Sequence, residues 1–286
     1  MLVPALLSLN FFVVLVMLSI GLRVTGRQML DVLRNRALLA RALAANCVLI
    51  PVLGLILVKI FPLTPDASIG VMLLATIPGT PIALQFTRKA KTRLAFAAGM
   101  TFVLSVVSIG LTPLAVEVIP QIAQRSERPI VNLVVSILLY IGAPLCVGLW
   151  VGQRVPRIAL RLVLPLEILA TLVFGFLMWE TRLVRRAALV AIAGRQTILA
   201  IFLLLVLSML IGWLIGGPDL ESRRVLATAT GMRSVIVVLY VARYCFPGTN
   251  VYMVPIVYLS LMVPINLLFY LAYAGWHRLR PFPTPV

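Results

Sequence analysis

Long apolar segments, separated by short charged linkers, occupy almost the whole of this 286-residue sequence. A run of about 20 apolar residues is long enough to cross a hydrocarbon core about 30 Å thick. Hydrophobic residues make up 62% of the chain, above their share in soluble domains. The sequence therefore predicts an all-α polytopic membrane protein with about nine transmembrane helices. The expected segments are approximately residues 2–22, 37–61, 67–89, 93–119, 129–152, 157–179, 195–216, 222–243 and 250–275.

The residues with reactive side chains form no catalytic or metal-binding pattern. The three cysteines, Cys47, Cys146 and Cys245, are far apart, and the one histidine, His277, follows the last apolar segment. These positions give neither a disulfide framework nor a zinc spacing, and the sequence contains no GxSxG or HExxH motif. We therefore expect no enzyme activity, no resident metal and no cofactor. The apolar N-terminus has no basic n-region, which favours a first transmembrane helix over a signal peptide.

The 25 lysines and arginines are distributed unevenly between the two sets of linkers. Sixteen fall in the loops that begin with Arg23 and end with Arg280, and eight fall on the opposite side. Because basic loops stay on the cytoplasmic side, the sequence predicts a cell (inner) membrane protein with a cytoplasmic C-terminus and an external N-terminus. The net charge of +17 reflects this bias, so we expect no nucleic-acid partner. The basic stretch 181–195 fits this topology poorly.

Two apolar segments are interrupted by helix-breaking residues about halfway along. Residues 74–79 read LATIPG in one of them, and residues 226–231 read LATATG in the other. Proline removes a backbone donor and glycine loosens a helix, so each segment is expected to break at mid-membrane. The topology gives the two segments opposite orientations. Such a pair is typical of transporters with inverted repeats, although a simple proline kink and an incidental glycine would give the same pattern.

The chain resembles the bile acid:sodium symporter (BASS) family over nearly its whole length. The resemblance is carried by the stretches MLSIGL, CVLIPVLG, PGTPIALQ to LTPLAV, and TGMRSV, and it begins at the family's second helix. It implies panel and core bundles with two broken crossing helices, and transport of organic anions, such as bile acids or small carboxylates, with sodium. We therefore expect a single transporter domain over 1–286. It comprises a four-helix first repeat (1–120), a five-helix second repeat (127–276) and a cytoplasmic tail (277–286).

The positions that would bind sodium in the family are mostly substituted here. By resemblance they are Ala83, Leu84, Ala97, Thr101 and Ala229 for the first ion, with Asn46 and Arg233 at the second. Hard cations need several oxygen ligands. Of the first set only Thr101 keeps a side-chain oxygen, and Ser105 lies one turn further on the same face. Sodium coupling through the family's ligands is therefore not expected.

Arg233 is the basic residue that lies in the middle of an apolar segment, away from both ends. A charge at mid-membrane costs about 2.5–3.5 kcal/mol on the insertion scale, so it should face a cavity and have a partner. One hypothesis makes Arg233 a tethered cation in place of sodium, whose planar fork binds a substrate carboxylate. The other makes it structural, paired with Glu167, the one acid well inside an apolar run, or with broken-helix carbonyls. For Glu167 the alternatives are snorkelling to the interface and proton coupling.

Polar residues beside the two breaks complete the candidate site. Thr76 and Thr228 are matched in the LATxxG repeat, with hydrogen bonds to their own helices as the alternative role. The expected substrate- or ion-binding residues are Asn46, Thr76, Gly79, Thr80, Thr101, Ser105, Glu167, Thr228, Thr230, Gly231, Arg233 and Ser234. The predicted function is alternating-access transport of a small organic anion across the lipid bilayer. The alternatives are a sodium symporter with other ligands and a non-transporting membrane receptor or scaffold with the same fold.

Overall fold

A computed structural model of the chain describes residues 2–78, 94–118, 129–192 and 194–279. All regular elements in these ranges are helices, and η1 and η2 are π-helical. They are α1 (Leu2–Arg23), α2 (Gly26–Arg34), α3 (Arg36–Ala44), η1 (Ala45–Leu49), α4 (Ile50–Ile60), α5 (Pro65–Thr76), α7 (Leu94–Val118), α9 (Ile130–Ile137), η2 (Leu138–Gly142), α10 (Ala143–Arg154), α11 (Pro156–Ile192), α12 (Arg195–Ile215), α13 (Leu220–Gly231), α14 (Val235–Cys245) and α15 (Met253–Leu279).

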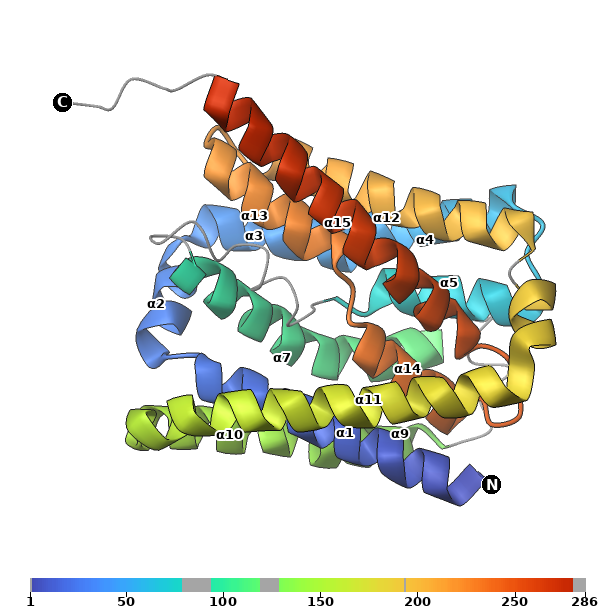
Figure 1. The fold of residues 1–286 in the computed structure, drawn as a ribbon. Helices are drawn as coiled ribbons and strands as arrows, with labels where there is room; N and C mark the ends of the chain where they lie inside the picture. Colours follow the sequence, from blue (N-terminus) through green and yellow to red (C-terminus); the bar gives the residue numbers. More distant parts are fainter. Residues whose placement is uncertain (1, 79–93, 119–128, 193, 280–286) are drawn as a thin grey trace.

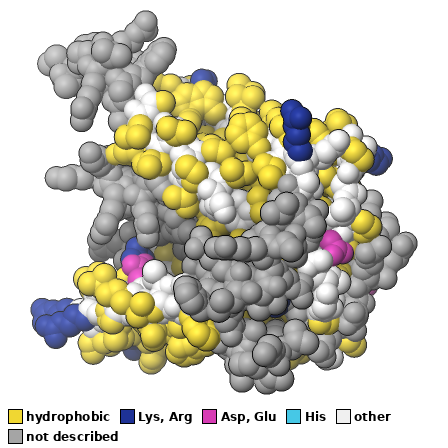
Figure 2. Space-filling view, turned by 45° about the vertical axis from the view of Figure 1, so that its right-hand side comes forward, with side chains coloured by type: hydrophobic (Ala, Val, Ile, Leu, Met, Phe, Trp, Pro, Cys, Tyr) yellow, Lys and Arg dark blue, Asp and Glu magenta, His cyan; other side chains and the backbone are white. Residues whose placement is uncertain are grey.

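Apolar helices long enough to cross a membrane confirm the predicted class. Among the described residues there are five of them, Arg36–Ile60, Ile130–Arg154, Arg195–Ile215, Leu220–Cys245 and Met253–Ala272. Shorter apolar helices include α5. On the face shown in Figure 2, most of the described side chains are hydrophobic, and the few charged ones lie toward the margins. The chain is an all-α, multi-pass membrane protein.

The helices are arranged in two layers with shorter helices between them. Helices α1, α9–α10 and α11 lie together in the first layer, and α3–α4, α12, α13 and α15 lie in the second (Figure 1). Helices α7 and α14 run between the layers, and α5 packs against α4, α14 and α15. The apolar stretch of α13–α14 is enclosed by the protein over its whole length. Any polar group at the break between α13 and α14 must therefore find its partners within the protein.

Glycines bring α1 and α10 of the first layer into direct backbone contact. A Cβ atom on Gly21 would lie 2.3 Å from the carbonyl oxygen of Leu145, and one on Gly148 would lie 2.4 Å from that of Leu18. Gly148 and Gly152 form a GxxxG pattern, which lets membrane helices approach closely. Because no side chain fits at this contact, α1 and α10 are held in one register.

Some element boundaries differ from those expected from apolarity. Helix α11 continues for 37 residues to Ile192, through the basic stretch that fitted the topology poorly. A nine-residue helix, α2, occupies the linker after α1, and α15 extends through Leu279 into the expected tail. Hydropathy detects the part of a helix that crosses the hydrocarbon. It does not detect where the helix ends, because arginine, leucine and alanine all continue a helix well in water.

Candidate functional site

The first broken helix, α5, ends at a proline. Its N-terminus is capped by the Thr64 hydroxyl, which accepts a hydrogen bond from the backbone of Ala67. At the other end, Ile77 has extended backbone angles (φ −98°, ψ 101°), and its N–H donates to the Leu73 carbonyl at 3.1 Å. Residues before proline are pushed out of the α region. Pro78 therefore ends the helix here for a local, covalent reason.

The second broken helix, α13, ends in the same geometry without a proline. The Asp219 carboxylate caps it by accepting from the backbone N–H of Ser222 at 3.3 Å. After Gly231, Met232 adopts φ −98° and ψ 96°, which nearly equal the angles of Ile77. Helix α14 begins at Val235. The cause of this break must lie in its tertiary contacts.

The two half-helices are equivalent, but not in the register that the sequence repeat suggested. Both have 12 residues, and each begins directly after its capping residue. The last helical residue is Thr76 in one and Gly231 in the other. The LATxxG repeat instead matches Thr76 with Thr228, three residues earlier. The LATxxG motif lies at both breaks, but it aligns Thr76 with Thr228. The N-caps and the ends of the two helices instead align Thr76 with Gly231.

The Arg233 side chain joins the two breaks. Its Nε donates to the Leu74 carbonyl at 2.7 Å and its Nη2 to the Ala75 carbonyl, both in the last turn of α5. Its Nη1 donates to Asn46 Oδ1 at 2.7 Å. The side chain is completely buried. A guanidinium therefore occupies the negative, C-terminal end of a half-helix, where a cation is favoured.

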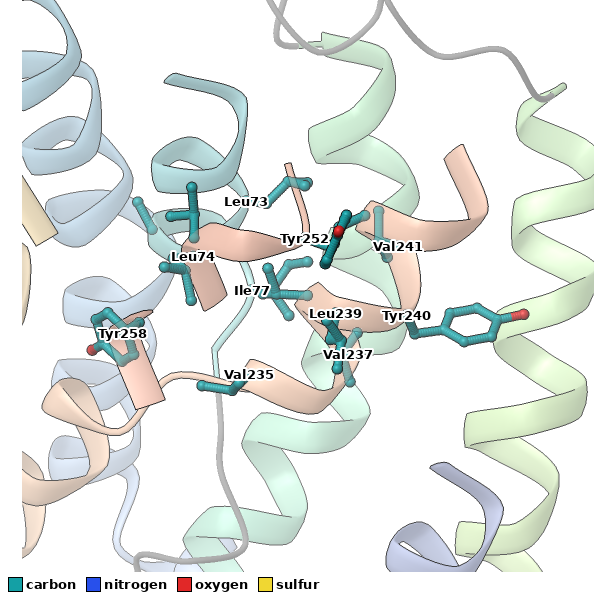
Figure 3. Packing of buried hydrophobic residues seen from close by; sticks show 14 of the residues in the cluster. Leu73, Leu74, Ile77, Val235, Val237, Leu239, Tyr240, Val241, Tyr252 and Tyr258 are labelled. Atoms are coloured by element: carbon teal, nitrogen blue, oxygen red, sulfur yellow. The ribbon is translucent and has the colours of Figure 1, made fainter. Parts of the chain in front are cut away.

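Backbone and apolar contacts also link the breaks. The N–H of Ser234, which is buried, donates to the Ile77 carbonyl at 3.5 Å. Figure 3 shows Ile77 in one hydrophobic cluster with Val235, Val237 and Leu239, which follow the second break. The C-terminal end of α5 thus meets the break between α13 and α14 in the protein interior.

A π-helical turn carries the third acceptor for Arg233. Asn46 lies in η1 (Ala45–Leu49), between α3 and α4, and it is fully buried. Its Nδ2 donates to the Ala42 carbonyl at 2.9 Å, which leaves Oδ1 to accept from Arg233. Single π turns inside α-helices occur often at functional sites. The structure thus brings together Asn46, Arg233 and Ser234 from the expected set.

Tyr258 of α15 is a site residue that the sequence did not reveal. Its hydroxyl donates to the Gly231 carbonyl at 2.6 Å, and its side chain is fully buried. Gly231 itself has no room for a side chain, since a Cβ atom would lie 2.2 Å from Cγ of Met209. The tyrosine lies in an apolar segment without a motif, so nothing in the sequence signalled this contact.

The threonines near the breaks have different roles. Thr76 donates to the Met72 carbonyl at 2.9 Å, and Thr228 donates to the Arg224 carbonyl at 2.9 Å, so both bond to their own helices. Thr230 donates to the Ser208 carbonyl of α12 at 2.8 Å and so joins two helices. The Thr76 and Thr228 hydroxyls therefore make the bonds to their own helices that were the alternative to a binding role.

The structure corrects the expected partner of Arg233. Glu167 of α11 forms an ion pair with Arg23 of α1 and accepts from the Ser19 hydroxyl at 3.4 Å. Both partners of Glu167 thus lie on α1 within the first layer. Arg233 instead bonds to the last turn of α5 and to η1. The pairing of Arg233 with broken-helix carbonyls, the other structural alternative, is the one observed.

Some expected residues lie outside what is described. Gly79 and Thr80 fall in the undescribed range 79–93, and Thr101 is placed in α7 by its backbone only. Ser105, one turn further along α7, is buried. Of the positions that correspond to the family's first sodium ligands, Ala229 is buried in α13, and the assignment of these positions stays a prediction from the sequence.

The chemistry of the crossing does not fit a sodium ion beside Arg233. The Leu74 and Ala75 carbonyls and Asn46 Oδ1 are oxygen acceptors that a hard cation could use, but the guanidinium donates to all three. Among the described residues there is no group of three His, Cys, Asp or Glu side chains that could hold a metal. The Nε and Nη2 atoms, which form the planar fork for carboxylates, are also engaged with carbonyls.

These features are typical of one class of membrane protein. Two half-helices that meet inside a multi-pass helical bundle form the kind of site found in secondary transporters. Residues 10–213 match the Sodium Bile acid symporter family, so the chain belongs to this family of membrane transporters. The match ends before α13, so Arg233 lies outside the matched residues. No curated protein matches the sequence significantly.

Proposed function

We propose that this protein is a secondary transporter of a small organic anion in which Arg233 replaces a sodium ion. Transport would proceed by alternating access. The first layer, with α1, α10 and α11, acts as the panel. The second layer, which includes α13, acts as the core together with α5 and α14. Lys/Arg bias supports a cell (inner) membrane location with the C-terminus inside and the N-terminus outside.

The position of the guanidinium is the observation that carries this proposal. In transporters with broken helices, the C-terminal ends of half-helices and unwound carbonyls coordinate the coupling cation. Here the Leu74 and Ala75 carbonyls, at such an end, accept from Arg233. A fixed positive charge at this place balances the helix dipole as a bound cation would. Coupling to sodium is then unnecessary at this position.

The same geometry favours an anionic substrate near the crossing without direct contact with the guanidinium. Arg233 compensates the negative end of α5, which would otherwise repel an anion. Helix α14 begins at Val235, immediately after the second break, and presents its positive end there. In this arrangement the backbone of α14 binds the anion, and Arg233 keeps the local potential positive.

Thermal unfolding in sodium and potassium tests the tethered cation. A ligand present at a free concentration of 100 times its Kd stabilises the folded state by about 2.7 kcal/mol. We expect no sodium-specific rise in Tm for the wild type. Arg233→Gln should have a lower Tm than the wild type. This Tm should rise partly in sodium but not in potassium, because the Leu74 and Ala75 carbonyls no longer accept from a guanidinium and can bind the ion. Arg154→Gln, at the exposed end of α10, is the matched control. A sodium-specific rise in the wild type would contradict the proposal.

Counterflow in proteoliposomes tests transport itself. Vesicles loaded with pyruvate or taurocholate, and free of sodium, should accumulate the labelled form of the same anion transiently. Exchange that requires sodium would indicate an ordinary sodium symporter with other ligands. Complete absence of exchange for both anions would favour a receptor or scaffold with this fold.

A further inference from the structure

An ion pair inside the first layer has no role in the crossing. Arg23 Nη2 of α1 contacts Glu167 Oε1 of α11, and the Ser19 hydroxyl donates to the same oxygen at 3.4 Å. Glu167 lies eleven residues after the first residue of α11, or about 16 Å along the helix. It lies within the apolar segment expected to cross the membrane (157–179), where an ionisable side chain is costly and commonly has a function.

Glu167 lies at the border between the buried and the exposed side of α11. Val163 and Ala170, about one turn before and after it, are buried, whereas Leu164 and Thr171, at similar spacing on the other flank, are exposed. About a third of the Glu167 side chain, 34%, is accordingly exposed. A carboxylate surface in contact with hydrocarbon is strongly disfavoured. The exposed part of the carboxylate is therefore expected to be in contact with water.

Glu167 is also the one carboxylate at membrane depth among the described acidic side chains. Asp66 lies in the first turn of α5. Asp219 and Glu221 lie at the start of α13. Glu117 is at the C-terminal end of α7, where it is exposed. Among these groups, Glu167 is the carboxylate farthest from either end of its helix.

We propose that Glu167 is a proton-binding site that couples transport to a proton gradient, with Arg23 as the partner of its charged form. This inference rests on the proposed function and names its coupling ion. A proton from water binds a carboxylate oxygen of Glu167, the ion pair opens, and Arg23 is left with one uncompensated positive charge. A monovalent anionic substrate restores neutrality, and both leave on the other side.

This charge balance explains why proton and anion would move together. The empty carrier, with the ion pair formed, and the carrier with both proton and anion have the same net charge. A carrier with only one of the two has one extra charge, which is costly in a low-dielectric environment. The favoured stoichiometry is thus one proton for each monovalent anion.

The surroundings of Glu167 contain few other charged or titratable groups. From α1 the facing charge is Arg23, and α1 contains no further ionisable side chain. From α10 the groups are Cys146 and Arg154, the latter at the end of the helix next to the start of α11. On α11 itself, Arg157 and Arg161 precede Glu167 by ten and six residues. Arg23 is therefore the charged group in contact with Glu167.

An infrared titration of the purified protein in nanodiscs tests the proton site without a substrate. The wild type should gain a carboxylic-acid carbonyl band on acidification that Glu167→Gln lacks and Glu117→Gln keeps. If Glu167→Gln alone fails to fold, Arg23→Gln/Glu167→Gln removes both charges together and serves in its place. Identical titrations of the wild type and the Glu167 variant would overturn the proposal.

Uptake driven by a pH gradient tests the coupling. With the vesicle interior one pH unit more alkaline, one-for-one coupling should give about tenfold accumulation of pyruvate or taurocholate. Protein-free vesicles measure passive entry of the protonated acid. Glu167→Gln should retain counterflow but reach a concentration ratio near that of the protein-free control, while Glu117→Gln should match the wild type. Gradient-driven accumulation by Glu167→Gln would overturn the proposal. If neither anion shows counterflow, the proposed transport fails for these anions, and the infrared titration still decides the proton site.

Discussion

The two breaks have nearly the same backbone geometry but different physical causes. Ile77 leaves the helix because Pro78 follows it, whereas Met232 leaves the helix without a proline nearby. At the second break the stabilising contacts are tertiary, and they include the Arg233 side chain on α5 and the Tyr258 hydroxyl on Gly231. One shape can thus be encoded locally in one half of a molecule and by partner helices in the other.

The two half-helix ends also differ in charge. A guanidinium lies at the end of α5, and a neutral phenol lies at the end of α13. Only at the end of α5 does a side chain supply the positive charge that a bound cation would supply. The following substitutions separate the two breaks, beginning with the largest expected effect.

Replacing Arg233 should cost the most. Arg233→Met keeps much of the side-chain volume but leaves the Leu74 and Ala75 carbonyls and Asn46 Oδ1 buried without their donor. Breaking a buried charged network typically destabilises by about 3–5 kcal/mol. Thermal unfolding followed by tryptophan fluorescence measures the loss. Arg154→Met, at an exposed helix end, should stay within about 0.5 kcal/mol of the wild type. Equal effects of both variants would mean that the guanidinium does not hold the crossing.

A side chain at the last residue of α13 should be the next most damaging change. In Gly231→Ala the new Cβ atom would lie 2.2 Å from Cγ of Met209. Overpacking of this kind costs about 1–3 kcal/mol. Thr76→Ala, at the equivalent residue of α5, loses only bonds to its own helix and should cost less. Combining Gly231→Ala with Met209→Ala should cost less than the sum of the single changes. Additive losses would refute the steric explanation.

Removing the phenol hydroxyl should have a smaller effect on stability. Tyr258→Phe deletes the hydrogen bond to the Gly231 carbonyl, a loss of about 0.5–1.5 kcal/mol. Tyr270→Phe, on the same helix, is the control because its ring remains in place over Arg224. Denaturation of both variants in the same detergent gives the comparison. If Tyr258→Phe is as stable as Tyr270→Phe, the hydrogen bond to Gly231 does not stabilise the second break.

The proline itself should matter least for stability. Pro78→Ala frees the unfolded chain and should cost about 0.4–1 kcal/mol, because Arg233 still occupies the Leu74 and Ala75 carbonyls. The Tm difference from the wild type measures this cost. A loss larger than that of Arg233→Met would reverse the comparison and make the first break depend mainly on the proline.

Part of the site could be read from the sequence. Arg233 stands out as a charge within an apolar segment, and resemblance to a transporter family pointed to Asn46. Of the two structural partners expected for Arg233, the broken-helix carbonyls are observed and Glu167 is not. The choice between them could not be made from the sequence, and Tyr258 was missed, because in segments where most positions are apolar the pattern does not show which face meets which helix.

The sequence by itself determined the class of this protein, its membrane-spanning segments and the first break. Segment length, apolarity and a proline act on the residues that carry them or on their immediate neighbours. The tertiary structure decided the register of the second break, the partners of Arg233 and the pairing of Glu167 with Arg23. Those features depend on hydrogen bonds and close contacts between helices far apart in the chain. They exist only once the helices have packed and buried polar groups have had to find partners.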